Sequence, residues 1–589
     1  MERSEGSVVL AFCAALVVAL GAAVVGRPHA AERPAAEQQP RAARLQAVEG
    51  LRHAVAAAAP EASDAGLRVL EEGGNAADAM VTASFVMAVV RPQSTGIGGG
   101  GFALYHDARS RTQTALDGRE RAPAGATETM YLDSRGNPTR DSLDGPRAAG
   151  VPGLVAMLWE LHQRHGSGAL TWARLVQPAI DLAEEGFPVP PSLARAIANR
   201  REVLQRHPAS RDLFMPKGRP LQAGDIFRQP GLGRTLRAIA REGRAGFYAG
   251  PVAAELSFKT RAAGGVLTQE DLAAYAVAER QPLRTTYRRR EVVTMPPPSS
   301  GGVALIQMLN VLSTWEEGLG QLRFHSPDHL HVLAETMKRA FADRAEHLGD
   351  PDFVAVPVAR LTGVPYALEL RRGIAMDRAM PSRELRAGLP AGPLEREHTT
   401  HISVIDAHGN AASSTQTVNT DLGSGFVAGD TGVLLNNEMD DFASKPGSPN
   451  VYGLVQGRQN AIAAGKRPLS SMTPTFVLHE GRVILVVGSP GGPRIINTVL
   501  QVVSNVVDFD LPLDQAVAAP RVHHQWLPDE LLVEAGLPTR TIAALGARGH
   551  VVRVLEGRGM GDVQAIGVRP SGARVAVSDP RAEGRPAAR

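Results

Sequence analysis

The chain has 589 residues, of which 43% are hydrophobic and 21% charged, a composition typical of globular proteins with an extensive buried core. The formal net charge is only +3 and no basic block is interleaved with aromatic residues, so the sequence does not indicate binding to nucleic acid. The single cysteine, Cys13, lies in an apolar leader, which excludes disulfides and cysteine-ligated metals from the rest of the chain.

The N-terminal segment predicts export. After Arg3, residues 8–26 form one uncharged apolar run, and small residues follow at Ala30 and Ala31. We expect 1–31 to be a secretory signal peptide or, because the run is long enough to cross a bilayer, an N-terminal membrane anchor. The protein would then be periplasmic or secreted. Residues 32–48, rich in Ala, Pro, Glu, Gln and Arg, predict a flexible linker.

Two helices are predicted with clear boundaries. Asn75 precedes a stretch rich in Ala, Val and Met with helical spacing, and Pro92 follows it, so we expect a helix that ends at Val90. The second begins at Ser326-Pro327-Asp328, with Ser as the N-cap, Pro in the first turn and Asp near the positive end of the helix dipole. It should run through Glu346.

A loose segment precedes an unusual threonine. Residues 371–398 lose helical periodicity and carry scattered Arg, Pro and Gly, and His398-Thr399-Thr400-His401 follows directly. A threonine hydroxyl is a poor nucleophile unless a base lies beside it, and cutting the chain before the threonine frees an α-amine that can be this base. The segment therefore raises the possibility of an internal threonine that becomes an N-terminus. A surface loop before an ordinary strand is the simpler alternative.

The residues from Thr400 to Asn419 predict a hairpin, because two strand patterns flank a turn that contains Asp, Gly and Asn. If the hairpin is centred on His408, Thr417 lies opposite Thr399. Asn419 then shares the face of Thr417, because side chains alternate along a strand. A slip of one residue would turn both away, so this register is a hypothesis.

Three later segments carry further polar chemistry. Residues 436–441 offer carboxylates and amides suited to an ammonium group, and 467–472 offer paired hydroxyls. Residues 483–488 have the pattern of a buried strand and run into Gly491-Gly492 and then a helix over 495–507. Consecutive glycines can direct two backbone N–H groups at one point, as an oxyanion hole requires. An acidic turn, capping serines and a tight strand–helix turn are the structural alternatives.

Taken together, the segments resemble the γ-glutamyltranspeptidases (glutathione hydrolases), a family of the N-terminal-nucleophile hydrolase superfamily. The resemblance runs from about Gly50 to Arg581. It rests on the Thr-Thr-His junction and on motifs in the family's order, which are Gly73–Ala79 (GGNAADA), Gly98–Phe102 (GGGGF), Ala340–Arg344 (AFADR), Leu434–Phe442 (LLNNEMDDF), Lys445–Leu454 (KPGSPNVYGL), Lys466–Thr475 (KRPLSSMTPT), Gly488–Thr498 (GSPGGPRIINT) and His523–Glu530 (HHQWLPDE).

The resemblance implies an α+β fold, a four-layer αββα sandwich of the N-terminal-nucleophile hydrolase type, made of heavy and light chains from one precursor. Self-cleavage between His398 and Thr399 would give a large subunit, 49–398, and a small subunit, 399–589. The Thr399 hydroxyl would attack the His398 carbonyl in this step and would afterwards be the catalytic nucleophile. We expect no cofactor and no metal.

The resemblance also implies the roles of individual residues. Thr417 would hydrogen-bond the nucleophile, and Gly491 and Gly492 would form the oxyanion hole. The groups that would bind the α-carboxylate of a γ-glutamyl substrate are Arg119, Ser470 and Ser471. The groups that would bind its α-ammonium are Asn419, Glu438 and Asp441. Tyr452 would belong to a lid, 446–457, over the pocket.

The expected substrates are glutathione and other γ-glutamyl compounds, with water, an amino acid or a dipeptide as acceptor. An acylase of the same fold that acts on cephalosporin side chains or other amides is one alternative. A non-catalytic exported binding protein is another.

We expect the last ten residues, 580–589, to be disordered.

Three other patterns in the sequence give weaker support for a functional site. Gly96–Gly101 satisfies a dinucleotide fingerprint, but a helix precedes it and a strand follows, the reverse of what that fingerprint requires. Ser489 follows a strand but lacks the Gly-x-Ser-x-Gly spacing of a serine hydrolase. The spacing of His325, His329 and His331 suits metal ligands, yet without a convergent acidic or cysteine partner packing roles are favoured.

Overall fold

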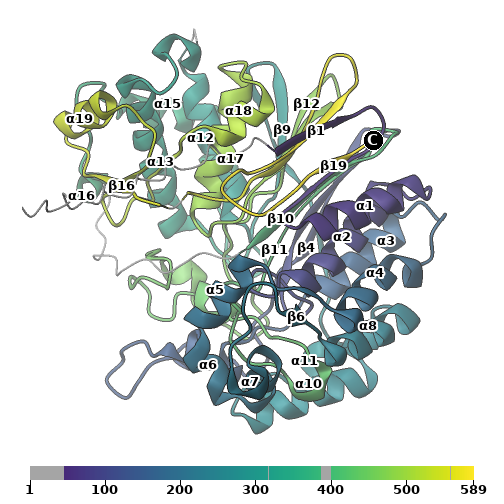
Figure 1. Cartoon of the computed structure of the whole chain (residues 1–589). Helices are drawn as coiled ribbons and strands as arrows, with labels where there is room; N and C mark the ends of the chain where they lie inside the picture. Colours follow the sequence, from purple (N-terminus) through teal and green to yellow (C-terminus); the bar gives the residue numbers. More distant parts are fainter. Residues whose placement is uncertain (1–45, 316–317, 386–398, 558) are drawn as a thin grey trace, which may run out of the picture. The chain divides into compact units, whose positions relative to one another are not determined.

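Two seven-stranded antiparallel sheets form the middle layers of the fold (Figure 1). The strand order of the first sheet is β1 (Gln46–Gly50), β18 (Arg574–Ser578), β17 (Gln564–Val568), β13 (Arg482–Gly488), β12 (Thr475–His479), β9 (Arg290–Thr294) and β8 (Leu283–Tyr287). The order of the second is β19 (Ala587–Ala588), β2 (Ala54–Ala57), β10 (Thr400–Ile405), β11 (Ala411–Thr417), β3 (Gly100–Asp107), β4 (Thr112–Gly118) and β7 (Ala278–Arg280).

The computed structural model describes residues 46–315, 318–385, 399–557 and 559–589. The predicted leader, nearly all of the predicted linker and His398 lie outside these residues. Within the described ranges, no helix is long and apolar enough to cross a membrane.

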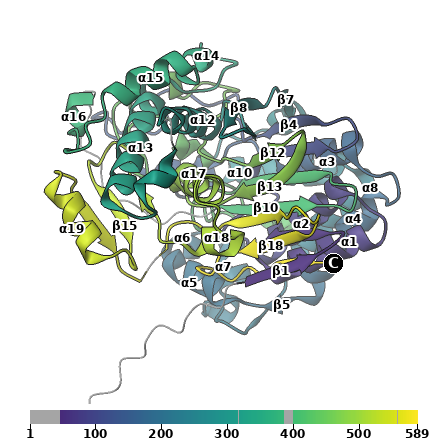
Figure 2. The same cartoon turned by 90° about the horizontal axis from the view of Figure 1, so that it is seen from above.

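Helices cover the outer face of each sheet and complete the four αββα layers (Figures 1 and 2). The helices on the second sheet are α1 (Pro60–Glu71), α2 (Ala76–Val90) and α3 (Leu154–His165), and those on the first are α12 (Ser300–Ser313) and α17 (Arg494–Val507), with α13 (Pro327–His347) packed on α12. Further helices are α4 (Trp172–Glu185), α5 (Pro191–Asn199), α7 (Pro208–Phe214), α8 (Pro230–Glu242), α10 (Gly250–Ala262), α15 (Val364–Arg372), α16 (Ser382–Leu385), α18 (Leu513–Ala518) and α19 (Thr539–Ala547). A small third sheet contains β14 (Val522–His523), β15 (Leu531–Glu534) and β16 (Val552–Leu555).

Alternate residues of the central strands enter different cores. On β3, Ala103 and Tyr105 pack with the helices α1, α2 and α3, whereas Phe102 and Leu104 pack between the two sheets. This follows from the two-residue period of a strand, and it means that both faces of a central strand are buried. A strand in this position cannot shift its register without exposing one core and overfilling the other.

Both helices with predicted boundaries are observed. The Asn75 side chain accepts hydrogen bonds from the backbone N–H groups of Ala77 and Asp78, and Asp78 accepts one in return from the Asn75 N–H, which completes a capping box. Helix α13 begins after Ser326, whose Oγ accepts from the His329 N–H at 3.2 Å, and ends one residue beyond the expected Glu346.

The predicted hairpin has the predicted register. Strands β10 and β11 pair antiparallel with Thr400 opposite Gln416 and Ile405 opposite Ala411, which is the pairing centred on His408. The hairpin occupies the centre of the second sheet, with β2 on one side and β3 on the other. The register therefore leaves Thr399, at the start of β10, beside the end of β11.

The expectation of a disordered C-terminus is wrong. Ala587 and Ala588 form β19 and pair with β2 at the edge of the second sheet. The Arg589 backbone N–H donates to the His53 carbonyl at 3.0 Å, and the His53 N–H donates back to the Arg589 carbonyl at 3.0 Å. The physical reason is that an open sheet edge pairs through backbone groups, which any residue supplies, so the polar, Pro-containing composition of this segment misled the prediction.

Both sheets contain strands from each side of the predicted cleavage point. Before it lie β2 and β3, and after it lie β10 and β11, which pair with them. Because the two resulting chains would share both central sheets, cleavage should leave them associated.

Denaturing electrophoresis of the purified protein should therefore show two chains, the smaller one with 191 residues (589 − 398). Size-exclusion chromatography without denaturant should give one peak that contains both. Elution of the two chains in separate peaks would contradict the mixed sheets.

Candidate active site

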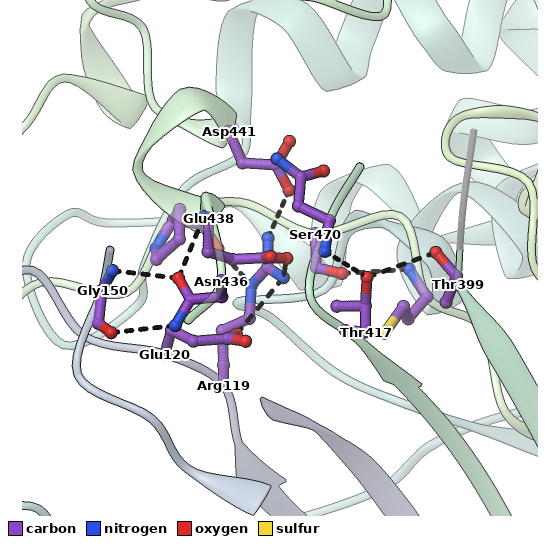
Figure 3. A network of polar contacts seen from close by, with 12 residues as sticks. Arg119, Glu120, Gly150, Thr399, Thr417, Asn436, Glu438, Asp441 and Ser470 are labelled. Carbon is purple, nitrogen blue, oxygen red and sulfur yellow. Dashed lines mark hydrogen bonds and ion pairs between the residues drawn. The ribbon is translucent and has the colours of Figure 1, made fainter. Parts of the chain in front are cut away.

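One pocket brings most of the predicted site residues together, although Gly491 is not among the residues that line it (Figure 3). It is lined by every predicted substrate-binding residue, by Thr399 and Thr417, and by Gly492. It is also lined by Arg344, which the sequence analysis quoted in a motif but gave no role. Residues from more than 350 positions of chain thus converge on one place (Arg119 to Gly492).

Thr399 lies next to Thr417, as the hairpin register requires. The Thr399 hydroxyl donates a long hydrogen bond, 3.5 Å, to the Oγ1 of Thr417. The backbone N–H of Asn419 donates to the same oxygen at 2.7 Å. Thr399 is 8% exposed, so its hydroxyl is reached through the pocket and not from open solvent. The end of β11 therefore holds a fixed hydroxyl beside the predicted nucleophile.

The two predicted oxyanion-hole glycines form a sharp turn between β13 and α17. Gly491 has φ of +135° and Gly492 φ of +51°, values that side chains with a Cβ rarely adopt. Their carbonyls accept from the backbone N–H groups of Arg494 and Ile495, at 2.9 and 3.2 Å. The turn leads into the N-terminus of α17, whose dipole favours negative charge. A developing oxyanion at Thr399 would lie near this end of the helix.

Arg119, the predicted carboxylate-binding group, is paired with two predicted ammonium-binding groups. Its guanidinium donates to Glu438 and to Asp441, and its Nε donates to the Pro468 carbonyl at 3.1 Å (Figure 3). The side chain is 1% exposed. The groups of opposite charge that would bind the two ends of a zwitterion therefore neutralise each other.

Burial and charge act in opposite directions on the pKa values of this cluster. Burial lowers the pKa of Arg119, but the charges of Glu438 and Asp441 outweigh it, and the pKa is raised. Burial raises the pKa of Glu438 well above its usual range and also raises that of Asp441, although the charge of Arg119 opposes both shifts. The arginine stays charged, and the carboxylates depend on it for their ionisation.

Glu120 is a member of this cluster that the sequence analysis missed. It is 0% exposed, and its Oε2 lies 3.6 Å from Nη1 of Arg119. Neither carboxylate oxygen has a hydrogen-bond partner in the described part of the chain. Burial raises the pKa of Glu120 to about 7. In the sequence, nothing distinguishes this residue from an acid on the surface.

The backbone around Arg119 is fixed from both sides. Its N–H donates to Oδ1 of Asp117 at 3.0 Å, and its carbonyl accepts from the hydroxyl of Tyr275 at 2.8 Å. Asp117 is itself buried and forms ion pairs with Arg280 and Arg467. The guanidinium is thus positioned by a rigid support, which suits a group that must bind a carboxylate in one orientation.

Asn436 holds the segment that carries Glu438 and Asp441. Its Oδ1 accepts from the N–H groups of Glu438 and Gly150, at 3.0 and 2.9 Å (Figure 3). Its Nδ2 donates to the Gly98 carbonyl at 2.8 Å. A Cβ at Gly98 would lie 2.2 Å from the carbonyl oxygen of Leu434. The glycine run at 96–101 therefore serves close packing of this segment.

Tyr452, which is predicted to belong to a lid, contacts Asn419. Its hydroxyl donates to Oδ1 of Asn419 at 2.6 Å, and the Asn419 Nδ2 donates to the Asn437 carbonyl at 3.0 Å. The Tyr452 carbonyl accepts from Nε2 of Gln525 at 3.1 Å, which ties this segment to the loop after β14. The Asn419 side chain is thereby held at the edge of the pocket.

The histidines considered as metal ligands have packing roles. His331 hydrogen-bonds His550 at 2.8 Å, and His329 packs on Phe509. Burial lowers the pKa of His329 to about 3. Across 46–315, 318–385, 399–557 and 559–589, no group of three or more His, Cys, Asp or Glu has an arrangement that could hold a metal ion.

Comparisons with known proteins agree with this geometry. A family model described as gamma-glutamyltranspeptidase matches residues 62–589. The chain belongs to this family. The glutathione hydrolase proenzyme of Escherichia coli strain K12 is 46% identical over 529 residues, which cover 90% of each chain.

Proteins with acylase names are also similar to the chain. The acylase ACY 1 proenzyme of Pseudomonas sp. strain SE83 is 40% identical over 537 residues, covering 90% of this chain and 92% of its own. The solved structure of a cephalosporin acylase from Bacillus halodurans superposes with a TM-score of 0.82 at 29% identity, covering 95% of this chain and 99% of its own. The proteins that are similar to this chain thus carry names for different activities.

The raised pKa of Glu120 should make stability depend on pH in a way that Glu120→Gln removes. Because the folded state raises this pKa from 4.5 to about 7, the native protein binds the proton more tightly than the unfolded chain. The resulting stabilisation is fully present below 4.5 and is lost as pH rises through about 7. Between these values the free energy of unfolding should fall less steeply with pH in Glu120→Gln than in the wild type. Chemical denaturation across this range measures it, and parallel curves would contradict the assignment.

Proposed function

We propose that the chain is an exported, self-processing glutathione hydrolase and γ-glutamyltransferase with Thr399 as its nucleophile. The observation that carries this proposal is that one pocket holds both the Thr399–Thr417 hydroxyl pair and the buried Arg119–Glu438–Asp441 cluster. The first can attack an amide, and the second complements the zwitterionic head of a γ-glutamyl group. Family membership and the similarity to glutathione hydrolase proenzymes support it.

Self-cleavage would use the same hydroxyl. The Thr399 Oγ1 adds to the His398 carbonyl, the peptide C–N bond breaks, and the acyl group passes to Oγ1 as an ester that water hydrolyses. This leaves a heavy chain that ends at His398 and a light chain over 399–589, whose new α-amine has an ordinary pKa of about 7.7–8.0. Such an amine can act as a base near neutral pH.

In turnover, this amine takes the proton from Oγ1 as the oxygen attacks the γ-carbonyl of the substrate. The backbone N–H groups of Gly491 and Gly492 would stabilise the oxyanion, and the amine then returns the proton to the leaving nitrogen as the C–N bond breaks. A γ-glutamyl ester on Thr399 remains. Water releases glutamate from it, and the amine of an acceptor releases a γ-glutamyl amide.

The charge cluster favours a γ-glutamyl group over an acyl group without an amine. A γ-glutamyl head brings a carboxylate for Arg119 and an ammonium for the carboxylates of Glu438 and Asp441 that it displaces. A glutaryl head brings only the carboxylate, so the displaced acids would remain buried without a cation. Leaving a buried charge unpaired is costly, and this cost would act against the acylase alternative.

Export and acceptor use are further parts of the proposal. Export rests on the apolar run at 8–26, and the intact mass of the mature heavy chain tests whether 1–31 is removed as a signal or kept as an anchor. Amino acids and dipeptides are the proposed acceptors. Glutamate release compared with formation of γ-glutamyl peptides, at fixed donor and rising acceptor, measures the balance between hydrolysis and transfer.

Cleavage and substrate binding should separate in two variants. Thr399→Ala lacks the attacking hydroxyl and should remain one chain on denaturing electrophoresis. Arg119→Ala should be cleaved normally, because Arg119 lies at the side of the pocket away from Thr399 (Figure 3). Its kcat/KM for γ-glutamyl-p-nitroanilide should fall by about 100-fold or more. Normal cleavage of Thr399→Ala, or undiminished turnover by Arg119→Ala, would each overturn the corresponding role.

The wild-type enzyme should also discriminate between two matched substrates. We expect kcat/KM for γ-glutamyl-p-nitroanilide to exceed that for glutaryl-p-nitroanilide, which lacks only the α-amine, by about 100-fold or more. Initial rates from p-nitroaniline release measure both. Equal values, or a preference for the glutaryl compound, would favour the acylase function.

A further inference from the structure

Arg344 is a buried cation in the pocket for which the proposed reaction has no role so far. It belongs to the last turn of α13, lines the same pocket as Arg119 and Thr399, and is 2% exposed. Burial lowers its pKa to about 10, so it remains charged at neutral pH. Burying a charge is costly unless it is paired or put to use.

Arg344 contacts hydroxyls where a carboxylate would be the usual partner. Its Nε donates to Oγ of Ser300 at 2.9 Å, and its Nη2 donates to Oγ of Ser471 at 3.4 Å. Among the residues that the structure describes, it forms no ion pair with a carboxylate, and its Nη1 has no hydrogen-bond partner. The guanidinium therefore keeps donor capacity at Nη1 that its protein contacts do not use, and the negative charge of Asp441 acts on it without forming an ion pair.

These contacts determine which way the hydroxyl protons point. A guanidinium can only donate, so Ser300 and Ser471 must each accept from it through oxygen. The Ser300 proton is then directed to the Ser470 carbonyl, where Oγ lies 2.6 Å from the oxygen. The Ser300 N–H donates to the same carbonyl at 2.7 Å. The Ser471 proton is left to point away from Arg344.

Further hydrogen bonds from the start of α12 hold the segment that carries both Ser470 and Ser471. Ser299, the N-cap of α12, donates from Oγ to the Met472 carbonyl at 2.6 Å, and the Ser470 Oγ accepts from the Met472 N–H at 3.1 Å. The start of α12 thus holds the backbone of 470–472, and Arg344 joins that helix start to Ser471. Arg344 is the only part of this arrangement that carries a charge.

We propose that Arg344 is a positioning residue for the substrate's α-carboxylate: it orients the Ser471 hydroxyl as a donor toward the pocket and places a second positive charge beside Arg119. The inference rests on the proposed function, because it assigns a specificity role within the same γ-glutamyl site. When the substrate's carboxylate displaces Glu438 and Asp441 from Arg119, the second cation would help to hold the added negative charge.

The test measures KM and kcat for Arg344→Gln and Arg344→Lys. The substrates are γ-glutamyl-p-nitroanilide and its analogue with an α-carboxamide in place of the α-carboxylate. We expect Arg344→Gln to raise KM for the first substrate by about tenfold or more with a smaller change in kcat, because a hydrogen bond to a charged group is lost. The carboxamide analogue should be affected much less. Arg344→Lys should recover part of the loss, since it keeps the charge but lacks the two-armed donor.

Ser471→Ala separates action through the hydroxyl from a general loss of structure. In a Ser471→Ala background, Arg344→Gln should raise KM by clearly less than it does alone, because the group that it orients is gone. The inference would be overturned if the effects of Arg344→Gln and Ser471→Ala on KM were fully additive in free energy. It would also be overturned if Arg344→Gln raised KM equally for the α-carboxylate and the α-carboxamide substrates. If Arg344→Gln is not processed, Arg344→Lys and Ser471→Ala carry the same comparison.

Arg339 supplies a matched control. It lies on the same helix, is 3% exposed and pairs with Glu335, and it does not line the pocket. Arg339→Gln should lower the thermal unfolding midpoint without changing the ratio of KM values for the two substrates. Absence of γ-glutamyl turnover in the wild type would refute the proposed function itself. Turnover in the wild type with an unchanged ratio in Arg344→Gln would refute only the role of Arg344.

Discussion

The pairing register of β10 with β11 is the constraint on which the site depends. It places Thr399 beside Thr417 and carries Asn419 to the edge of the pocket. The neighbouring strand approaches so closely that a Cβ at Gly99 would lie 2.1 Å from the Thr417 carbonyl oxygen. Because both faces of these strands are buried, a shift by one residue would disturb two cores at once. The proposed nucleophile, Thr399, is therefore positioned by the most constrained part of the fold.

Recognition depends on a different kind of interaction, the mutual neutralisation of buried charges. Arg119, Glu438 and Asp441 form ion pairs with one another, and burial of Glu120 adds a carboxyl group whose pKa is raised to about 7. A ligand must replace these pairs with others of equal quality, since burying an unpaired charge costs more than an ion pair returns. A zwitterion meets this requirement, and an anion alone does not. Selectivity for a zwitterionic ligand would then come from the free energy lost when an anion leaves the carboxylates of Glu438 and Asp441 without a cation.

Local signals and long-range charges differed in how well they could be predicted from sequence. Asn75 and Ser326 marked helix starts because capping involves residues three apart, and the hairpin register followed from the position of its turn. The motifs of the family identified residues of the pocket. The pairing of Arg119 with Glu438 joins residues 319 positions apart, and only folding brings them together. Glu120 and Arg344 escaped notice because a charged residue is ordinarily exposed, and β19 because edge pairing needs no particular side chain.

The hairpin that carries Thr399 and the charge cluster around Arg119 are separate parts of the site, and this has a consequence for how substrate preference can change. The proposed self-cleavage would use the hairpin and its hydroxyls, whereas the proposed substrate choice would use side chains from the residue after β4, from α13 and from the loops at 436–441 and 467–472. A substitution in the charge cluster can therefore change the preferred acyl group while the precursor still matures. Relatives named as glutathione hydrolases and as acylases are both similar to this chain. In this chain the carboxylates opposite Arg119 are present, and their need for a cation is the physical basis for preferring an acyl group that carries an amine.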